Sequence, residues 1–196
     1  MKRPIVIEFS GLPNSGKTTL LCNMKKYVKN NNVNALIMQE AAELLPNVIP
    51  KGDIAQNLWI TLETLQKSLE IIFKSNVDFI LLDRGYYNQL FLATMYKNEN
   101  EKYFEYIKNF MEKFAEFYDV KPDYLYVVDV DIDESIRRRM NTGGPVTFSK
   151  ENFLKNYKAE FKKFYEKIDS PILYVDTTNM SEHEVADSVY KKIITL

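Results

Sequence analysis

The chain has 196 residues, of which 45% are hydrophobic and 27% charged, values typical of a single globular domain that can bury a core. Its formal net charge of −1 argues against a broad nucleic-acid surface, and its single cysteine, Cys22, excludes an internal disulfide and a thiolate metal cluster. No apolar run reaches the roughly 20 residues that span a bilayer, and the N-terminus turns acidic too early for a signal peptide, so we expect a cytoplasmic protein without a membrane partner.

The first predicted strand is the apolar, β-branched run PIVIEF at residues 4–9. It leads into GLPNSGKTT (11–19), which has the spacing G-x-x-x-x-G-K-[ST]. The residues that follow carry Leu20, Leu21 and Met24 at helical spacing. Strand, glycine-rich loop and helix, in this order, form the arrangement that a phosphate-binding loop requires.

Such a loop binds phosphate because its backbone N–H groups point inward and the next helix adds its positive N-terminal end. Lys17 is expected to reach the β- and γ-phosphates of a nucleotide, and the Thr18 hydroxyl to ligate Mg²⁺. The predicted nucleotide-binding residues of this segment are Gly11, Asn14, Ser15, Gly16, Lys17, Thr18 and Thr19.

Strand-like and helix-like segments alternate along the rest of the chain. Strands are predicted at 34–40, 77–85, 123–131 and 171–178, and helices at 54–74, 87–96, 101–118 and 150–168, with a last helix ending at Leu196. This alternation predicts one α/β domain over residues 1–196, with a five-stranded parallel sheet covered by helices on both faces.

Two helices carry apolar stripes that we interpret mainly as core. In 101–118 the stripe consists of Phe104, Ile107, Met111, Phe114 and Tyr118. In 54–74, Trp59 lies among Leu58, Leu62 and Leu65, and the alternative is that Trp59, Gln56 and Gln66 contact a flat base.

Ligands of open parallel sheets bind beyond the carboxyl ends of the strands, so polar residues there are functional candidates. The apolar strand FILLD ends in Asp83, an acid suited to a position near Mg²⁺. Arg84 follows, and a fixed cation is suited to stabilising a transferring phosphoryl group or to gripping an acceptor. The alternative for both residues is an ordinary ion pair.

Glu40 follows the second strand and is a candidate to accept the proton of an attacking hydroxyl or to orient it. Asp83 is a rival for the same role, and a solvated strand-end carboxylate is the structural alternative. The fourth strand ends at Asp129 and the fifth at Asp176-Thr177-Thr178.

The segment DESIRRRMNTGGP begins a predicted small lid over about residues 133–149. Consecutive helical residues diverge by about 100°, so Arg137, Arg138 and Arg139 cannot all face one ligand. One or two of them are expected to close over the phosphates and exclude water. A solvated basic face is the alternative, and Glu134 lies at the right spacing to pair with Arg138.

These residues together resemble the P-loop nucleoside and nucleotide kinases, in particular the thymidylate kinase and deoxynucleoside kinase branch. The likeness covers nearly the whole chain, through GLPNSGKTTL, QEAAELLP, LLDRGYYNQLFLATMY and KPDYLYVVDVDIDESIRRR. It implies a three-layer P-loop NTPase fold and transfer of the γ-phosphoryl group of ATP, with Mg²⁺, to a nucleoside or nucleoside monophosphate. It also implies that Arg138 is the lid arginine that contacts the nucleotide, and that a homodimer is possible.

The acceptor is left open by departures from that pattern. Gln39 stands where thymidylate kinases carry an acceptor-binding arginine, which favours a neutral acceptor, and the motifs also look like kinases similar to nicotinamide-riboside kinases. The catalytic residues predicted on this reading are Lys17, Glu40, Asp83, Arg84 and Arg138. The rival from another class is a P-loop ATPase switch, because the D-x-x-G and N-K-x-D motifs of a GTPase do not occur in the chain.

Overall fold

The computed structural model of the chain describes residues 3–50, 54–73, 76–95, 101–143 and 150–196. Residues 144–149 of the predicted lid and the last residues of the predicted 54–74 and 87–96 helices therefore lie outside the described residues. By its internal contacts the chain divides into two compact units, Met1–Glu8 with Ala35–Asp123, and Phe9–Asn34 with Tyr124–Leu196.

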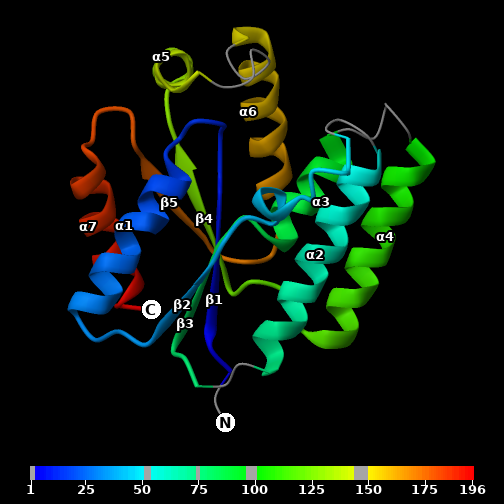
Figure 1. Cartoon of the computed structure of the whole chain (residues 1–196), viewed down its shortest axis with the longest axis horizontal. Coiled ribbons are helices and arrows are strands. Elements are labelled where there is room, and N and C mark those ends of the chain that lie inside the picture. Colours follow the sequence, from blue (N-terminus) through cyan, green and yellow to red (C-terminus); the bar gives the residue numbers. More distant parts are fainter. Residues whose placement is uncertain (1–2, 51–53, 74–75, 96–100, 144–149) are drawn as a thin grey trace. The chain divides into compact units, whose positions relative to one another are not determined.

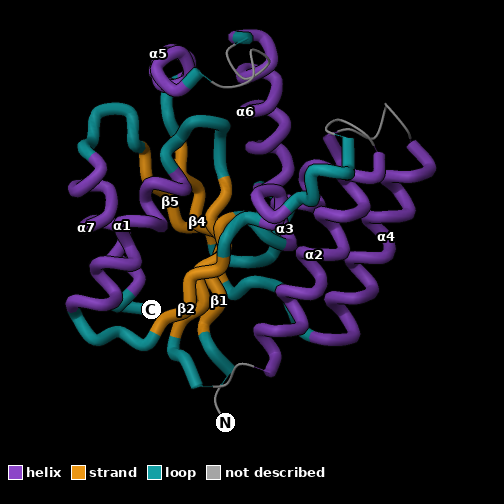
Figure 2. Tube along the Cα trace, viewed as in Figure 1, coloured by secondary structure: helices purple, strands orange, loops and turns teal. Residues whose placement is uncertain are grey.

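The structure confirms the α/β class. The described residues contain seven α-helices and a five-stranded parallel sheet of strand order β2-β3-β1-β4-β5, consistent with a three-layer α/β fold (Figure 2). The five strands are β1 (Ile5–Ser10), β2 (Ala35–Met38), β3 (Phe79–Asp83), β4 (Tyr124–Asp129) and β5 (Ile172–Asp176).

In the first unit, the β2 and β3 strands run parallel, with Met38 opposite Leu82. Val6, Met38, Ile71, Ile80 and Leu82 form a buried cluster there. Helices α2 (Ile54–Phe73), α3 (Tyr86–Met95) and α4 (Glu101–Tyr118) pack together beside one another (Figure 1). A short 3-10 helix, η1 (Ala41–Leu44), is separated from the end of β2 by two residues and is an element that the sequence does not predict.

The predicted core stripes are only partly right. In α4, Phe104, Ile107 and Met111 are buried as predicted, whereas Ala115 completes that face and Tyr118, the last residue of the helix, is 42% exposed. Helical periodicity explains the change, since steps of three, four and four residues from Phe104 reach Ala115 rather than Phe114.

In α2 the core interpretation is wrong for Leu58 and Leu62, which are exposed, and right for Leu65. Thr61, Thr64 and Ser68 are buried instead. Two of these hydroxyls are satisfied within the helix, because Thr61 donates to the Asn57 carbonyl and Ser68 donates to the Thr64 carbonyl. A buried helix face can therefore carry small hydroxyl residues, which apolar periodicity does not detect.

The second unit holds α1 (Lys17–Asn30), α5 (Ile132–Thr142), α6 (Glu151–Tyr165) and α7 (Glu182–Ile193). The β4 and β5 strands pair in parallel, with Asp129 opposite Asp176. Helices α1 and α7 lie side by side, with Tyr27 against Tyr190, and α6 lies on the other side of β4 and β5 in Figure 1. Thr177, which directly follows β5, donates its hydroxyl to the Ser15 carbonyl at 2.9 Å, so the carboxyl end of this strand lies next to residues 11–16.

None of the helices in the described ranges combines the length and apolarity needed to cross a bilayer.

Candidate phosphate-binding site

Residues 11–16, here called the 11–16 loop, connect β1 to α1. Gly16 is the N-cap of α1 and has a φ of 90°, a conformation that favours glycine. Gly11 has a φ of 147°, and a Cβ atom built on it would lie 2.0 Å from the Val128 carbonyl oxygen. Both glycines of the motif therefore meet backbone requirements: a left-handed turn at Gly16 and a close approach to β4 at Gly11.

Lys17 folds back over this loop. Its side chain is buried, and its Nζ donates to the carbonyl oxygens of Gly11 at 3.5 Å and Leu12 at 3.3 Å. The Lys17 ammonium group thus lies against the 11–16 loop, which contributes backbone N–H groups of its own. The position suits a cation that acts on an anion bound by the loop.

The remaining predicted nucleotide-binding residues differ in exposure. Thr18 and Thr19 are exposed in the first turn of α1, Asn14 is half-buried with a φ of 60°, and Ser15 is fully buried. The Ser15 hydroxyl has no hydrogen-bond partner among the described residues. A buried donor without a partner costs free energy, which a phosphate oxygen within the loop would relieve.

Arg138 reaches the outer side of the 11–16 loop. Its guanidinium donates to the Thr177 carbonyl at 2.7 Å and to the Thr177 hydroxyl at 3.0 Å, and its Nε donates to Glu134 at 2.8 Å. The predicted pairing of Glu134 with Arg138 is thus confirmed. Arg137 also pairs with Glu134 but is exposed, as expected for side chains 100° apart on a helix. Hydrogen bonds from Arg137 and Arg138 lower the pKa of Glu134 to about 2.

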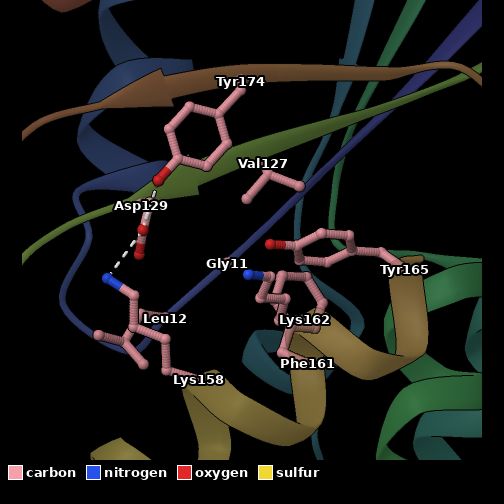
Figure 3. A pocket seen from close by; sticks show the side chains of 9 residues that line it. All are labelled: Gly11, Leu12, Val127, Asp129, Lys158, Phe161, Lys162, Tyr165 and Tyr174. Atoms are coloured by element: carbon pink, nitrogen blue, oxygen red, sulfur yellow. Dashed lines mark hydrogen bonds and ion pairs between the residues drawn. The ribbon is translucent and has the colours of Figure 1, made fainter.

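A cavity of about 270 Å³ borders the start of the loop, between α6 and the β4 and β5 strands (Figure 3). Asp129 lies on its wall and accepts hydrogen bonds from Lys158 of α6 at 2.8 Å and from the Tyr174 hydroxyl at 2.5 Å. Burial and the hydrogen bond to Asp129 raise the pKa of Tyr174. Asp129, a strand-end acid in the sequence, therefore ties α6 to both strands. The lining residues are Gly11, Leu12, Val127, Asp129, Lys158, Phe161, Lys162, Tyr165 and Tyr174.

In the other unit, the structure brings Glu40 and Arg84 together. Arg84 Nη1 lies 2.5 Å from Glu40 Oε1, and both side chains are partly buried. Arg84 has a φ of 57°, a conformation that is uncommon for a residue with a side chain. Asp83, which precedes it at the end of β3, is buried. Two residues predicted for separate roles thus form a single charged pair next to the third.

Lys67 of α2 is a residue of this group that sequence reasoning missed. Its Nζ donates to the Gln39 carbonyl at 2.5 Å. Burial lowers the pKa of Lys67, while Glu63, Glu70, Glu40 and Asp83 raise it. Its place within the long helix carries no motif, so only the packing of α2 against the end of β2 reveals it.

Glu8 is a second missed residue. It is fully buried in β1, and its carboxylate accepts the backbone N–H groups of Tyr87 and Asn88 in the first turn of α3. A single acid inside an apolar strand is the sequence signal that was available. Burial raises the pKa of Glu8 to about 7, although the amide hydrogen bonds and Arg84 act in the opposite direction.

The predicted metal ligands, Thr18 and Asp83, belong to different units, so their pairing around Mg²⁺ stays a prediction. Within the described ranges, no three His, Cys, Asp or Glu side chains are grouped so as to hold a metal ion. A nucleotide-bound Mg²⁺ site usually combines one or two protein ligands with phosphate oxygens and water, so it does not need three such side chains.

No protein-family model matches the chain, and no curated protein matches it.

Proposed function

We propose that this chain is a kinase that transfers the γ-phosphoryl group of Mg-ATP to the hydroxyl of a small acceptor, a nucleoside or nucleoside monophosphate. The observation that supports this most is the 11–16 loop, where a left-handed Gly16 opens α1 and the buried Lys17 folds over the loop carbonyls. Backbone amides, a helix N-terminus and a fixed cation in one loop suit a chain of phosphates.

On this proposal, the acceptor oxygen attacks the γ-phosphorus, the bond between that phosphorus and the bridging oxygen breaks, and ADP leaves. Lys17 neutralises charge on the β- and γ-phosphates, and bound Mg²⁺ supplies further charge neutralisation. Glu40 or Asp83 orients the acceptor hydroxyl and takes its proton. Arg84, which is paired with Glu40, holds that carboxylate in place and lies next to Asp83 in the chain.

Arg138 is proposed to contribute from the loop's outer side, where it contacts Asn14 and Thr177. Arg138 Nη1 lies 3.8 Å from the place that a Cβ at Gly16 would take, an ordinary contact distance, so the guanidinium lies near the end of the loop. Proximity to the loop supports a contribution of Arg138 to nucleotide binding.

The test is ADP release from Mg-ATP in the presence of a panel of nucleosides, nucleoside monophosphates and nicotinamide riboside. One acceptor should raise the rate well above the basal value, and Lys17→Ala should lower that rate roughly a hundredfold or more. Lys25→Ala is the matched control, because Lys25 is an exposed lysine of the same helix.

If Mg-ATP binds but no acceptor raises the rate, the kinase proposal fails and an ATPase switch, or an acceptor outside this panel, takes its place. If Lys17→Ala and Lys25→Ala behave alike, the loop is not the phosphate site.

A further inference from the structure

Every carbonyl oxygen of residues 11–15 accepts a hydrogen bond from a side chain. Lys17 takes the first two, at Gly11 and Leu12. The other three are bound from outside the loop: Pro13 by the Ser135 hydroxyl at 2.8 Å, Asn14 by Arg138 at 3.5 Å, and Ser15 by the Thr177 hydroxyl at 2.9 Å. The loop is thus held by residues more than 100 positions away in the chain.

The direction of these bonds bears on phosphate binding. A trans peptide unit is planar, and its C=O and N–H point in opposite directions. The Pro13 carbonyl shares its peptide unit with the Asn14 N–H, and the Ser15 carbonyl shares its unit with the Gly16 N–H. Holding these two carbonyls toward Ser135 and Thr177 therefore points both N–H groups away from those side chains.

Thr177 has one hydroxyl proton, and the structure indicates where it goes. Its oxygen lies 2.9 Å from the Ser15 carbonyl and 3.0 Å from that of Asp129, and it accepts from Arg138. The Asp129 carbonyl already accepts the Thr177 backbone N–H at 3.0 Å. The Ser15 carbonyl has no equivalent backbone donor among the bonds of the described residues. We therefore assign the Thr177 hydroxyl proton to the hydrogen bond with the Ser15 carbonyl.

Ser135 makes a similar link from α5. It is fully buried, donates to the Pro13 carbonyl, and accepts from the Asn14 side-chain amide at 3.3 Å. A serine on the buried side of a basic helix would ordinarily satisfy a carbonyl of its own helix. Here it is used on the 11–16 loop, so α5 is attached to that loop at its first turn.

We propose that Ser135 and Thr177 are positioning residues for phosphate binding: their hydroxyls hold the Pro13 and Ser15 carbonyls outward so that the Asn14 and Gly16 amides face the phosphates. This inference rests on the proposed function, since it assigns these residues to the same nucleotide site. It goes further by making the phosphate affinity of the loop depend on two hydroxyl groups that touch no phosphate.

The experiment measures the dissociation constants of Mg-ATP and of inorganic tripolyphosphate by calorimetry for the full chain and five variants. Thr177→Val removes the hydroxyl at constant shape, and Ser135→Ala removes the other. Each substitution should raise the dissociation constants of both ligands about tenfold, because an unsatisfied buried carbonyl lets the loop rearrange. Thr195→Val and Ser188→Ala are the matched controls on exposed positions and should bind like the wild type.

Thr177→Ser separates positioning from general stability, since it restores the hydroxyl while deleting the methyl group. Binding of both ligands at the wild-type level by Thr177→Ser supports the proposal, and it does so even where Thr177→Val fails to fold. Equal losses in Thr177→Ser and Thr177→Val would overturn it, because the methyl group rather than the hydroxyl would then matter.

The two proposals fail in different ways. If the wild-type chain binds neither Mg-ATP nor tripolyphosphate, the proposed function is wrong. If the wild type binds both ligands while Thr177→Val and Ser135→Ala, folded as judged by their melting temperatures, bind them equally well, the function stands and the positioning role is wrong.

Discussion

The Glu8 carboxylate accepts the backbone N–H of Tyr87 at 2.9 Å, and this contact joins the interior of β1 to the first turn of α3. A second amide, that of Asn88, donates to the same carboxylate at 2.7 Å. Gly85 lies so near that a Cβ there would meet Glu8 Oε2 at 3.1 Å. The turn that carries Asp83 and Arg84 is therefore built against a fully buried acid.

This acid predicts a pH dependence of stability. The pKa of Glu8 is raised to about 7 in the folded chain from an ordinary value of 4.5, chiefly by burial, with Arg84 and the amides of Gly85, Tyr87 and Asn88 opposing the rise. Between these two values the folded state binds more protons than the unfolded state. The stability that Glu8 contributes to the free energy of unfolding is therefore fully present below about pH 4.5 and is lost as pH rises through 7. The expected loss in the free energy of unfolding is about 3 kcal/mol.

Denaturant unfolding at a series of pH values between 5 and 8 measures the slope of the free energy of unfolding against pH. Glu8→Gln should remove it, because an amide does not titrate in this range, whereas Glu105→Gln on the exposed face of α4 should keep it. A Glu8→Gln variant with the wild-type slope would show that another group is responsible.

Gly11→Ala should be severely destabilising. The new Cβ would lie 2.0 Å from the Val128 carbonyl oxygen, at a φ of 147° that L side chains rarely adopt. We expect a loss of about 3 kcal/mol or more in the free energy of unfolding. Gly143→Ala is the control, since its φ of 66° is also left-handed but no atom lies within 4 Å of the new Cβ. That change should cost only about 1 kcal/mol. Equal costs at both positions would contradict the close approach at Gly11.

Glu40 and Arg84 should be energetically coupled. Their pair is partly buried, with exposed side-chain fractions of 15% and 26%, so solvent screens it less than it screens a surface pair. A double-mutant cycle with Glu40→Gln and Arg84→Met should give a coupling energy of about 1 kcal/mol. The exposed pair Asp187 and Lys191 on α7 is the reference, with an expected coupling of roughly 0.3–0.5 kcal/mol. A coupling energy at Glu40 and Arg84 no larger than this reference would contradict the prediction that partial burial strengthens the pair.

The burial pattern of α2 can be tested with two leucines. Leu65 is buried, and Leu65→Ala should lower the free energy of unfolding by about 2–3 kcal/mol through lost packing. Leu62 is 53% exposed, and Leu62→Ala should change it by roughly 0.5 kcal/mol or less. Similar losses for the two variants, measured by denaturant unfolding, would mean that Leu62 is covered in solution.

Much of the fold follows from local pattern. The apolar runs predicted as strands at 4–9 and 77–85 contain most of β1 and all of β3. The glycine spacing of residues 11–16 produces a left-handed turn before α1, and the alternation of strands and helices yields a parallel α/β sheet. These features depend on residues close together in the chain, whose backbone preferences and periodicity act over a few positions. The same locality explains why Glu134 and Arg138, four residues apart, pair as expected.

Tertiary structure alone decided the remaining features. Thr61 and Ser68 of α2 are buried by tertiary packing, whereas Leu58 and Leu62 of the same helix are exposed. Thr177 reaches Ser15 across 162 positions, and Ser135 reaches Pro13 across 122. A serine or threonine has no local pattern that names a distant carbonyl as its partner, because the need for that partner arises only when folding removes both groups from water. The motif in the sequence therefore predicts a phosphate loop, while the side chains that hold its carbonyls are visible only in the folded chain.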